Sequence, residues 1–197
     1  MDIRLVVGLG NPGVDYEATR HNAGFLLMDR LIERNQAQRV EFSGICDLWT
    51  FQRDGQTVFL MKPLTYMNLS GDALVAFFER YSVPHEAILV AYDDIALPLG
   101  RLRIRPSGSA GGQKGMRHII DTLQTSALPR LRIGIKTEAL AHTPVVDYVL
   151  GRFSSDETPI MSRVLDIAAD AVEAWFLSEL AEVMNRYNKK AAEPLSP

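Results

Sequence analysis

The sequence predicts an α/β fold, a single-domain mixed sheet with helices on both faces. Short apolar runs typical of buried strands alternate with segments of helical apolar spacing. The dipeptide Asp54-Gly55 joins two of these runs and is a strong hairpin signal. The 197 residues, 47% of them hydrophobic, suffice for one sizeable core. We therefore expect one domain over residues 1–190, followed by a disordered tail, AAEPLSP, at residues 191–197.

In the first half of the chain, the strands and helices are indicated by their apolar spacing. The run Ile3–Leu9 predicts a short buried strand, which the stretch GLGNPG ends. Apolar residues recur at helical spacing from Ala18 to about Arg34, which predicts a helix. The other elements expected here are strands at Leu48–Arg53 and Thr57–Met61, a helix over Ala73–Tyr81, and a strand at Ala87–Tyr92 that ends on Asp93-Asp94.

The second half begins with a strand of unusual charge. Arg101–Arg105 alternates basic and aliphatic residues, as a half-exposed strand does, and the flexible loop PSGSAGG follows it. A helix over Lys114–Gln124 and a strand at Leu131–Ile135 come next. Ser154 and Glu157 have the spacing of a capping box. They predict the start of one long amphipathic helix that runs to about Tyr187.

Composition narrows the cellular context. Cys46 is the single cysteine, so no intrachain disulfide can form, which fits a reducing cytoplasm. The N-terminus lacks the pattern of a secretory signal, and no apolar stretch has the length of a membrane span. We expect a cytoplasmic protein without a membrane partner.

The net charge of −3 conceals a basic segment. Between Gly100 and Lys136 the chain carries eight basic residues and one acidic residue, Asp121. Such a local excess attracts phosphate groups even when the whole chain is acidic. The segment therefore favours a polyanionic partner.

The glycines of GLGNPG raise the question of a dinucleotide site. Gly8, Gly10 and Gly13 fit the spacing G-x-G-x-x-G behind a strand. However, Asn11 precedes a proline, which favours extended backbone, and the helical pattern starts too late to meet a pyrophosphate. The acidic residue expected at the end of a second strand is also missing. A nicotinamide oxidoreductase is therefore the weaker hypothesis, and a tight glycine turn is the stronger one.

Among the possible catalytic residues, a histidine that could act as a general base is the best candidate in the sequence. The sequence has no cluster of metal-ligand spacing and no nucleophile elbow, so we expect no metal site. Of the four histidines, His21 lies just after the glycine loop, near the carboxyl end of the first strand. Asp93 and Asp94 follow another apolar strand, and an aspartate there can fix the tautomer of a histidine. The spacing does not decide between these two acids, and either could instead cap a turn.

Two asparagines follow strands in comparable places. Asn11 lies in the glycine loop, and Asn68 lies near the start of a helix. A side-chain amide at such a place can donate to a carbonyl or to a developing oxyanion. The alternative for Asn68 is a helix N-cap.

Taken together, these segments resemble a known family. VGLGNPG, YEATRHNAGF, KPLTYMNLSG, VAYDDIALPLG, GSAGGQKGM and LRIGI occur in this order and are similar to bacterial-type peptidyl-tRNA hydrolase, from about Arg4 to Tyr187. The resemblance implies an enzyme of translation that hydrolyses the ester between a peptide and the 3′ ribose of tRNA. It would recycle tRNA from prematurely released peptidyl-tRNA, as a cytoplasmic monomer without metal or cofactor.

The resemblance also implies roles for single residues. His21 matches the catalytic base, and Asp94 matches the acid that keeps this histidine basic. Asn11 matches the residue that distinguishes N-blocked from free aminoacyl-tRNA. Tyr16 and Asn68 match substrate-contacting positions, and Tyr66 stands where the family usually has phenylalanine. The family commonly reads GGHNG where this chain reads GGQKG. Lys114 thus replaces an asparagine, which keeps a donor and adds charge but loses an acceptor.

The basic segment then has a natural role. Arg101, Arg103 and Arg105 alternate along one strand and therefore form one row. We expect this row, with Lys114, Arg117 and Arg132, to contact acceptor-stem phosphates. Arg132 has an alternative, an ion pair with an internal acid inside the sheet. The alternative for the whole protein is a catalytically inactive RNA-binding module on the same fold.

Overall fold

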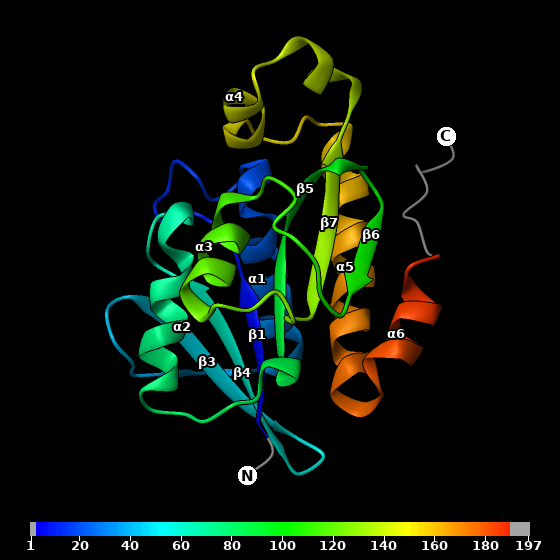
Figure 1. Ribbon diagram of the computed structural model, residues 1–197. Helices are drawn as coiled ribbons and strands as arrows, with labels where there is room; N and C mark the ends of the chain where they lie inside the picture. The colour runs from blue at the N-terminus through cyan, green and yellow to red at the C-terminus, as the bar shows by residue number, and fades with distance from the viewer. Residues whose placement is uncertain (1–2, 190–197) are drawn as a thin grey trace.

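The computed structural model of the protein describes residues 3–189, with a central sheet between two layers of helices (Figure 1). The sheet has seven strands in the order β2-β3-β4-β1-β5-β7-β6. The pairs β1/β4, β1/β5 and β5/β7 are parallel, and the other three are antiparallel, so the sheet is mixed as predicted. Its strands are β1 (Ile3–Gly8), β2 (Gln38–Val40), β3 (Cys46–Arg53), β4 (Gln56–Pro63), β5 (Ile88–Pro98), β6 (Leu102–Arg105) and β7 (Arg130–Lys136).

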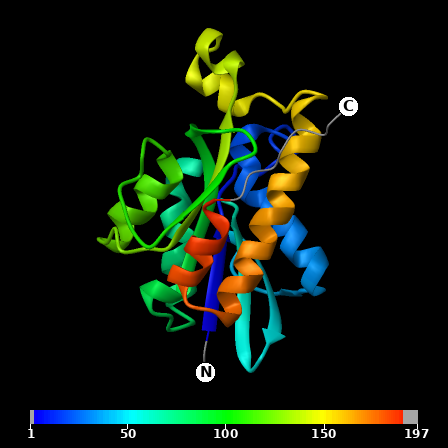
Figure 2. The ribbon, with the colours of Figure 1, turned by 90° about the vertical axis from the view of Figure 1, so that its right-hand side faces the viewer.

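Helices cover both faces of the sheet (Figure 2). On one face α1 (Ala23–Asn35) packs on α5 (Glu157–Leu177), and on the other α2 (Ser70–Phe78) packs on α3 (Lys114–Leu123). The short helix α4 (Val145–Leu150) stands beyond one end of the sheet, and α6 (Leu180–Tyr187) lies along β6. Four 3-10 turns complete the structure: η1 (Arg20–Asn22), η2 (Met67–Leu69), η3 (His85–Ala87) and η4 (Glu138–His142).

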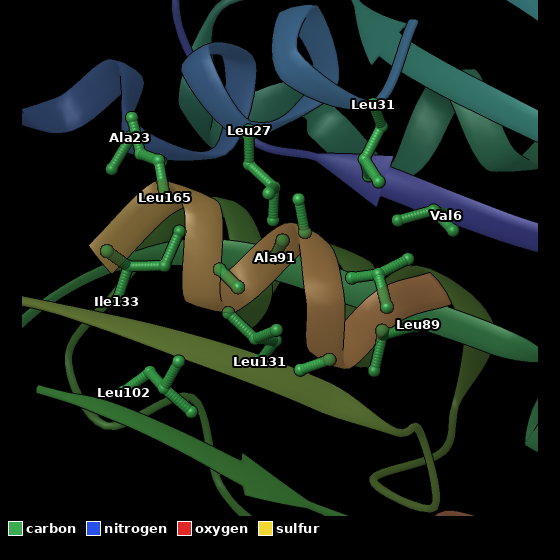
Figure 3. Packing of buried hydrophobic residues seen from close by; sticks show 14 of the residues in the cluster. Val6, Ala23, Leu27, Leu31, Leu89, Ala91, Leu102, Leu131, Ile133 and Leu165 are labelled. Carbon is green, nitrogen blue, oxygen red and sulfur yellow. The ribbon is translucent and has the colours of Figure 1, made fainter. Parts of the chain in front are cut away.

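The sheet separates two hydrophobic cores. Leu89 and Ala91 of β5 belong to the core under α1 and α5, together with Val6, Leu27 and Leu165 (Figure 3). The alternate residues Val90 and Tyr92 belong to the core under α2 and α3. Neighbouring residues of β5 therefore point to opposite faces, as strand geometry requires. This alternation decides which side chain reaches the functional site.

The long C-terminal helix of the prediction is in fact two helices. The reciprocal capping bonds of Ser154 and Glu157 confirm its start. The backbone N–H of Ser154 donates to the Glu157 carboxylate at 2.9 Å, and the backbone N–H of Glu157 donates to the Ser154 hydroxyl at 3.3 Å. The chain then becomes extended at Ser178, and α6 turns back onto the edge strand β6. There Asn188 accepts from the N–H of Ile104 and donates to its carbonyl, which occupies the open edge of β6.

Other boundaries also differ from the prediction, since α2 spans Ser70–Phe78 and not Ala73–Tyr81 and β3 begins at Cys46 and not Leu48, and two of the differences affect the site. The helix expected from Ala18 begins with the 3-10 turn η1 and becomes α-helical at Ala23. The strand β5 continues to Pro98, so Asp93 and Asp94 lie within it and do not end it. The predicted tail, residues 191–197, lies outside the described residues.

Candidate active site

A pocket of about 470 Å³ lies at the carboxyl ends of the parallel strands and is bounded on one side by α4. This is where open α/β sheets place their ligands. Six of the residues expected from the sequence line it: Asn11, His21, Tyr66, Asn68, Asp94 and Lys114. Tyr16 does not line it. One wall is apolar and consists of Ile95 and of four residues of α4: Val145, Val146, Val149 and Leu150.

The centre of the pocket is a histidine–aspartate pair. The Nδ1 of His21 lies 2.8 Å from Oδ2 of Asp93, and their side chains are 13% and 3% exposed. The carboxylate can only accept, so Nδ1 carries the hydrogen and Nε2 is left with a free lone pair. Asp93 thus fixes the orientation of the imidazole, and Nε2 is the ring nitrogen that can accept a proton.

The expectation that Asp94 holds His21 is wrong. Asp94 accepts from the backbone N–H of Ala96 at 2.7 Å and forms an ion pair with the Nε of Arg132. The reason is the alternation along β5. Odd-numbered residues of β5 face α1, the helix that continues from His21, whereas even-numbered residues face the other side. The alternation itself can be read from the sequence, but the packing of α1 decides which of the two faces carries the turn with His21.

The same ion pair changes the role expected of Arg132. Its guanidinium is engaged by Asp94 and is only 26% exposed, so the alternative of an internal partner is the observed one. Arg132 nevertheless lies directly opposite Arg103 of β6. It therefore lies beside the row with its charge compensated by Asp94.

Close packing of glycines sets His21 above the sheet. A side chain at Gly8 would overlap with the carbonyl of Gly24 and with Met28, and one at Gly24 would overlap with the backbone of Leu9 and Ala91. The first turn of α1 therefore rests directly on the ends of β1 and β5. Gly8 thus allows contact between strand and helix, a side chain at Gly10 would meet the ring of Phe25, and Gly13 adopts a φ of +108°, so the G-x-G-x-x-G spacing has reasons that need no pyrophosphate.

Asn22, which the sequence analysis missed, fixes the glycine loop to this turn. Its side chain accepts from the N–H of Asn11 at 2.8 Å and donates to the carbonyl of Asn11 at 3.0 Å. The Oδ1 of Asn11 in turn accepts from the N–H of Met67 at 2.9 Å. Because Oδ1 is occupied, the Nδ2 group of Asn11 is the part free to donate. The signal in the sequence was the position of Asn22 directly after His21.

Gln113 was also missed. It precedes α3 as its N-cap, is 8% exposed, and its side chain contacts Asp93.

Lys114 follows as the first residue of α3 and is exposed at the pocket, as expected of a substrate-facing cation. Asn68 is exposed inside η2, and the N-cap positions of η2 and α2 are held by Tyr66 and Leu69, so the N-cap alternative does not apply. Tyr66 beside it is 62% exposed.

Arg20 anchors the turn that carries His21. Its guanidinium forms an ion pair with Glu157 at 2.6 Å and lies 4.4 Å from the ring centre of Tyr148 in α4. The backbone N–H of Arg20 donates to Gly151 at 3.0 Å. These contacts join η1, α4 and the start of α5, so the base and the apolar wall are held in one frame.

The basic row is present on the edge of the sheet. Arg101 and Arg105 are exposed and Arg103 is half-buried, while Leu102 and Ile104 between them enter the core. Arg117 is exposed on α3. Arg130, the neighbour of Arg105 across the ladder, does not join them, since it is 1% exposed and bound to carbonyl oxygens. Burial also lowers its pKa and raises that of the adjacent Tyr92.

In the described part of the chain, neither a cysteine nucleophile nor a cluster of metal ligands accompanies this site. Burial raises the pKa of the Cys46 thiol to about 12, so it is not a nucleophile at neutral pH. Among residues 3–189 no three histidine, cysteine or carboxylate side chains are grouped as metal ligands. No helix in this range is long and apolar enough to cross a membrane.

Comparison with known proteins places the geometry in a family. The model of the family described as "Peptidyl-tRNA hydrolase" matches residues 5–194. The chain is 42% identical to a peptidyl-tRNA hydrolase of Chlorobium limicola and 44% identical to one of Alkaliphilus oremlandii, over 96% and 94% of its length and all of theirs.

Solved structures of peptidyl-tRNA hydrolases have the same fold as this chain. The crystal structure of peptidyl-tRNA hydrolase from Acinetobacter baumannii superposes with a TM-score of 0.88 at 33% identity, over 97% of both chains. A crystal structure of a peptidyl-tRNA hydrolase complexed with N-propanol gives the same TM-score at 34% identity, over 96% of both chains. By sequence and by fold, the chain belongs to the peptidyl-tRNA hydrolase family.

Proposed function

We propose that His21 and Asp93 activate the water that cleaves the ester between a peptide and the 3′ ribose of tRNA, the reaction for which the family is named. The observation that carries this proposal is the 2.8 Å bond between Nδ1 and Oδ2, in a pocket that is also lined by the side-chain amides of Asn11 and Asn68. The protein would thereby recycle tRNA from prematurely released peptidyl-tRNA. We expect it to act in the cytoplasm as a monomer, with no metal and no cofactor.

The steps follow from the free lone pair on Nε2 of His21. This nitrogen takes a proton from a water molecule, and the water oxygen attacks the ester carbonyl. Negative charge develops on the carbonyl oxygen, and this oxygen accepts a hydrogen bond from the side-chain amide of Asn68. The tetrahedral intermediate then breaks its bond to the ribose oxygen, which leaves with the proton from His21. No covalent bond to the protein forms, and Asp93 stabilises the transient imidazolium.

Asn11 supplies the preference for N-blocked substrates. Its free Nδ2 group can donate to the carbonyl oxygen of the group that acylates the last amino acid. A free aminoacyl-tRNA has no such carbonyl and offers an ammonium group, which cannot accept. A donor would then face a donor in a pocket where Asn11 is 8% exposed, which disfavours this substrate.

The tRNA is expected to lie along the arginine row. Arg103 and Arg105 share one face of β6, Arg101 directly precedes this strand, and Arg117 and Lys114 lie on α3. Their charges suit the phosphates of an acceptor stem, and the exposed ring of Tyr66 can stack on a base at the 3′ end. Tyr16 stays a substrate contact in this proposal, at the loop beside the pocket, although it does not line the pocket itself.

One reaction tests the proposal. The purified protein is incubated with N-acetylaminoacyl-tRNA in the presence of EDTA, and release of the acyl group is measured. We expect turnover by the wild type and its loss in His21→Asn, by about 10²–10⁴-fold, the usual share of a general base. Binding of tRNA should persist in the variant. Undiminished turnover in His21→Asn would exclude this residue as the base, and a silent wild type would favour the RNA-binding alternative.

A further inference from the structure

The side chain of Gln113 uses both ends of its amide inside the protein. Its Oε1 accepts from the backbone N–H of Met116 at 2.7 Å, which caps α3. Its Nε2 donates to Oδ1 of Asp93 at 3.2 Å and lies 3.1 Å from the sulfur of Met67. Because the N–H of Met116 requires an acceptor, the amide has one possible orientation. The donor is therefore aimed at Asp93.

Asp93 is consequently held from two sides. Oδ2 is bound to His21 and Oδ1 to Gln113, so each carboxylate oxygen has a partner although the residue is 3% exposed. With His21 alone, the carboxylate could rotate about its last bond, and the imidazole could follow it. A second donor on the other oxygen removes this freedom and satisfies a buried charge that would otherwise be costly.

We propose that Gln113 is a positioning residue, which holds the Asp93 carboxylate in the rotamer that orients His21 for catalysis. The inference rests on the proposed function, since it assigns a purpose to the geometry of that pair. Gln113 itself does not touch the reacting atoms in this account. Its effect passes through Asp93 to the imidazole.

The surroundings of Gln113 are built to be rigid. The buried guanidinium of Arg130 donates to the carbonyls of Gly108 and Ser109, at 2.6 and 2.9 Å, and so fixes the glycine-rich loop that precedes Gln113. A side chain at Gly115 would meet the sulfur of Met67 at 2.6 Å, so the start of α3 lies tightly against η2. A donor that is fixed on both flanks can impose geometry on its acceptor.

Gln113→Glu is the sharpest test. It retains the size of the side chain and an oxygen for the N–H of Met116, but it replaces the donor at Asp93 by a second carboxylate. We expect kcat to fall about tenfold to a hundredfold, as for other residues that orient a functional group, while KM stays near the wild-type value. Gln113→His, which restores a ring N–H donor, should recover most of the loss. Gln52→Glu makes the same change on an exposed position of β3 and should leave kcat unchanged.

A double-mutant cycle separates positioning from a general effect on stability. In the background of Asp93→Asn, Gln113→Glu should cost little more, because the group it positions is already gone. Gln113→Asn, whose shorter amide cannot span both partners, serves as second variant if Gln113→Glu does not fold.

The outcomes are distinct. Wild-type kcat in a folded Gln113→Glu or Gln113→Asn variant, or additive losses in the cycle, would overturn the inference while the loss in His21→Asn still upholds the proposed function. Failure of the wild type to release acyl groups would overturn the proposed function first.

Discussion

The pocket and the arginine row lie side by side on the same sheet, yet they are built in opposite ways. At the pocket, Asn11 and Asp93 are nearly buried, and side-chain hydrogen bonds join Asn11 to Asn22 and Asp93 to His21. In the row, Arg101 and Arg105 are exposed on an edge strand. A reaction needs groups held in place before the substrate arrives, because reorganisation would add to the barrier. Attraction of phosphates needs only charge at the surface, which side chains can adjust on contact.

Asp93 and Asp94 show the same contrast between adjacent residues. One completes the histidine pair, and the other neutralises Arg132 beside the row. Their substitutions should therefore have different consequences, although the chemical change is identical.

The largest effect is expected from Asp93→Asn. The variant loses the acceptor that fixes the tautomer and orientation of His21, so we expect kcat to fall about 10²–10⁴-fold. Asp94→Asn keeps an oxygen for the N–H of Ala96 and releases Arg132. It should retain kcat and change mainly the affinity for tRNA. Steady-state kinetics with N-acetylaminoacyl-tRNA measure both. If Asp94→Asn were the slower of the two, the assignment of Asp93 would be reversed.

A smaller effect is expected from Asn11→Asp, which sharpens the account of the pocket. The carboxylate still accepts from Met67, but it offers an oxygen where the amide offers a donor. The ratio of turnover on N-acetylaminoacyl-tRNA to turnover on aminoacyl-tRNA should fall about tenfold to a hundredfold, the cost of one or two lost or opposed hydrogen bonds.

Asn68→Asp is the matched control for this ratio. It should slow both substrates alike, since the developing oxyanion is common to both reactions. A ratio that is unchanged in Asn11→Asp would mean that another group reads the acylated nitrogen.

The smallest effect is expected in the row. Arg103→Ala should leave kcat unchanged and flatten the dependence of tRNA affinity on salt, by about 0.7–0.9 in log–log slope for one lost phosphate contact. Affinities measured over a series of salt concentrations give this slope. Arg39→Ala removes an exposed arginine from β2 at the opposite edge of the sheet and should not alter it. A wild-type slope in Arg103→Ala would remove the row from the tRNA site.

Several features of the fold follow from local patterns. The hairpin of β3 and β4 and the capping box of Ser154 and Glu157 depend on residues close in the sequence, and both were predicted. The break at Ser178 was not, because the apolar spacing continues across it. It arises from a distant contact, in which α6 covers the edge of β6 and Asn188 bonds to Ile104.

The site shows the same division. His21, Asn11 and Asn68 were identified because each lies just after a strand or glycine turn, at the sheet edge where ligands bind. Gln113 lies 20 residues from Asp93 in the chain, and nothing in its local pattern distinguishes it from an ordinary helix cap. Its partner became visible only when α3 was placed against η2 and β5.

The sequence by itself determined the class of fold, the family and the group of residues at the carboxyl ends of the strands, because local periodicity and short motifs carry that information. Only the tertiary structure decided that Asp93 holds the histidine, that Asp94 engages Arg132 and that Gln113 supports the carboxylate. These choices depend on which face of β5 each side chain leaves and on distances between elements far apart in the chain. Direction and distance are properties of the packed molecule, which the order of residues fixes only through the whole fold.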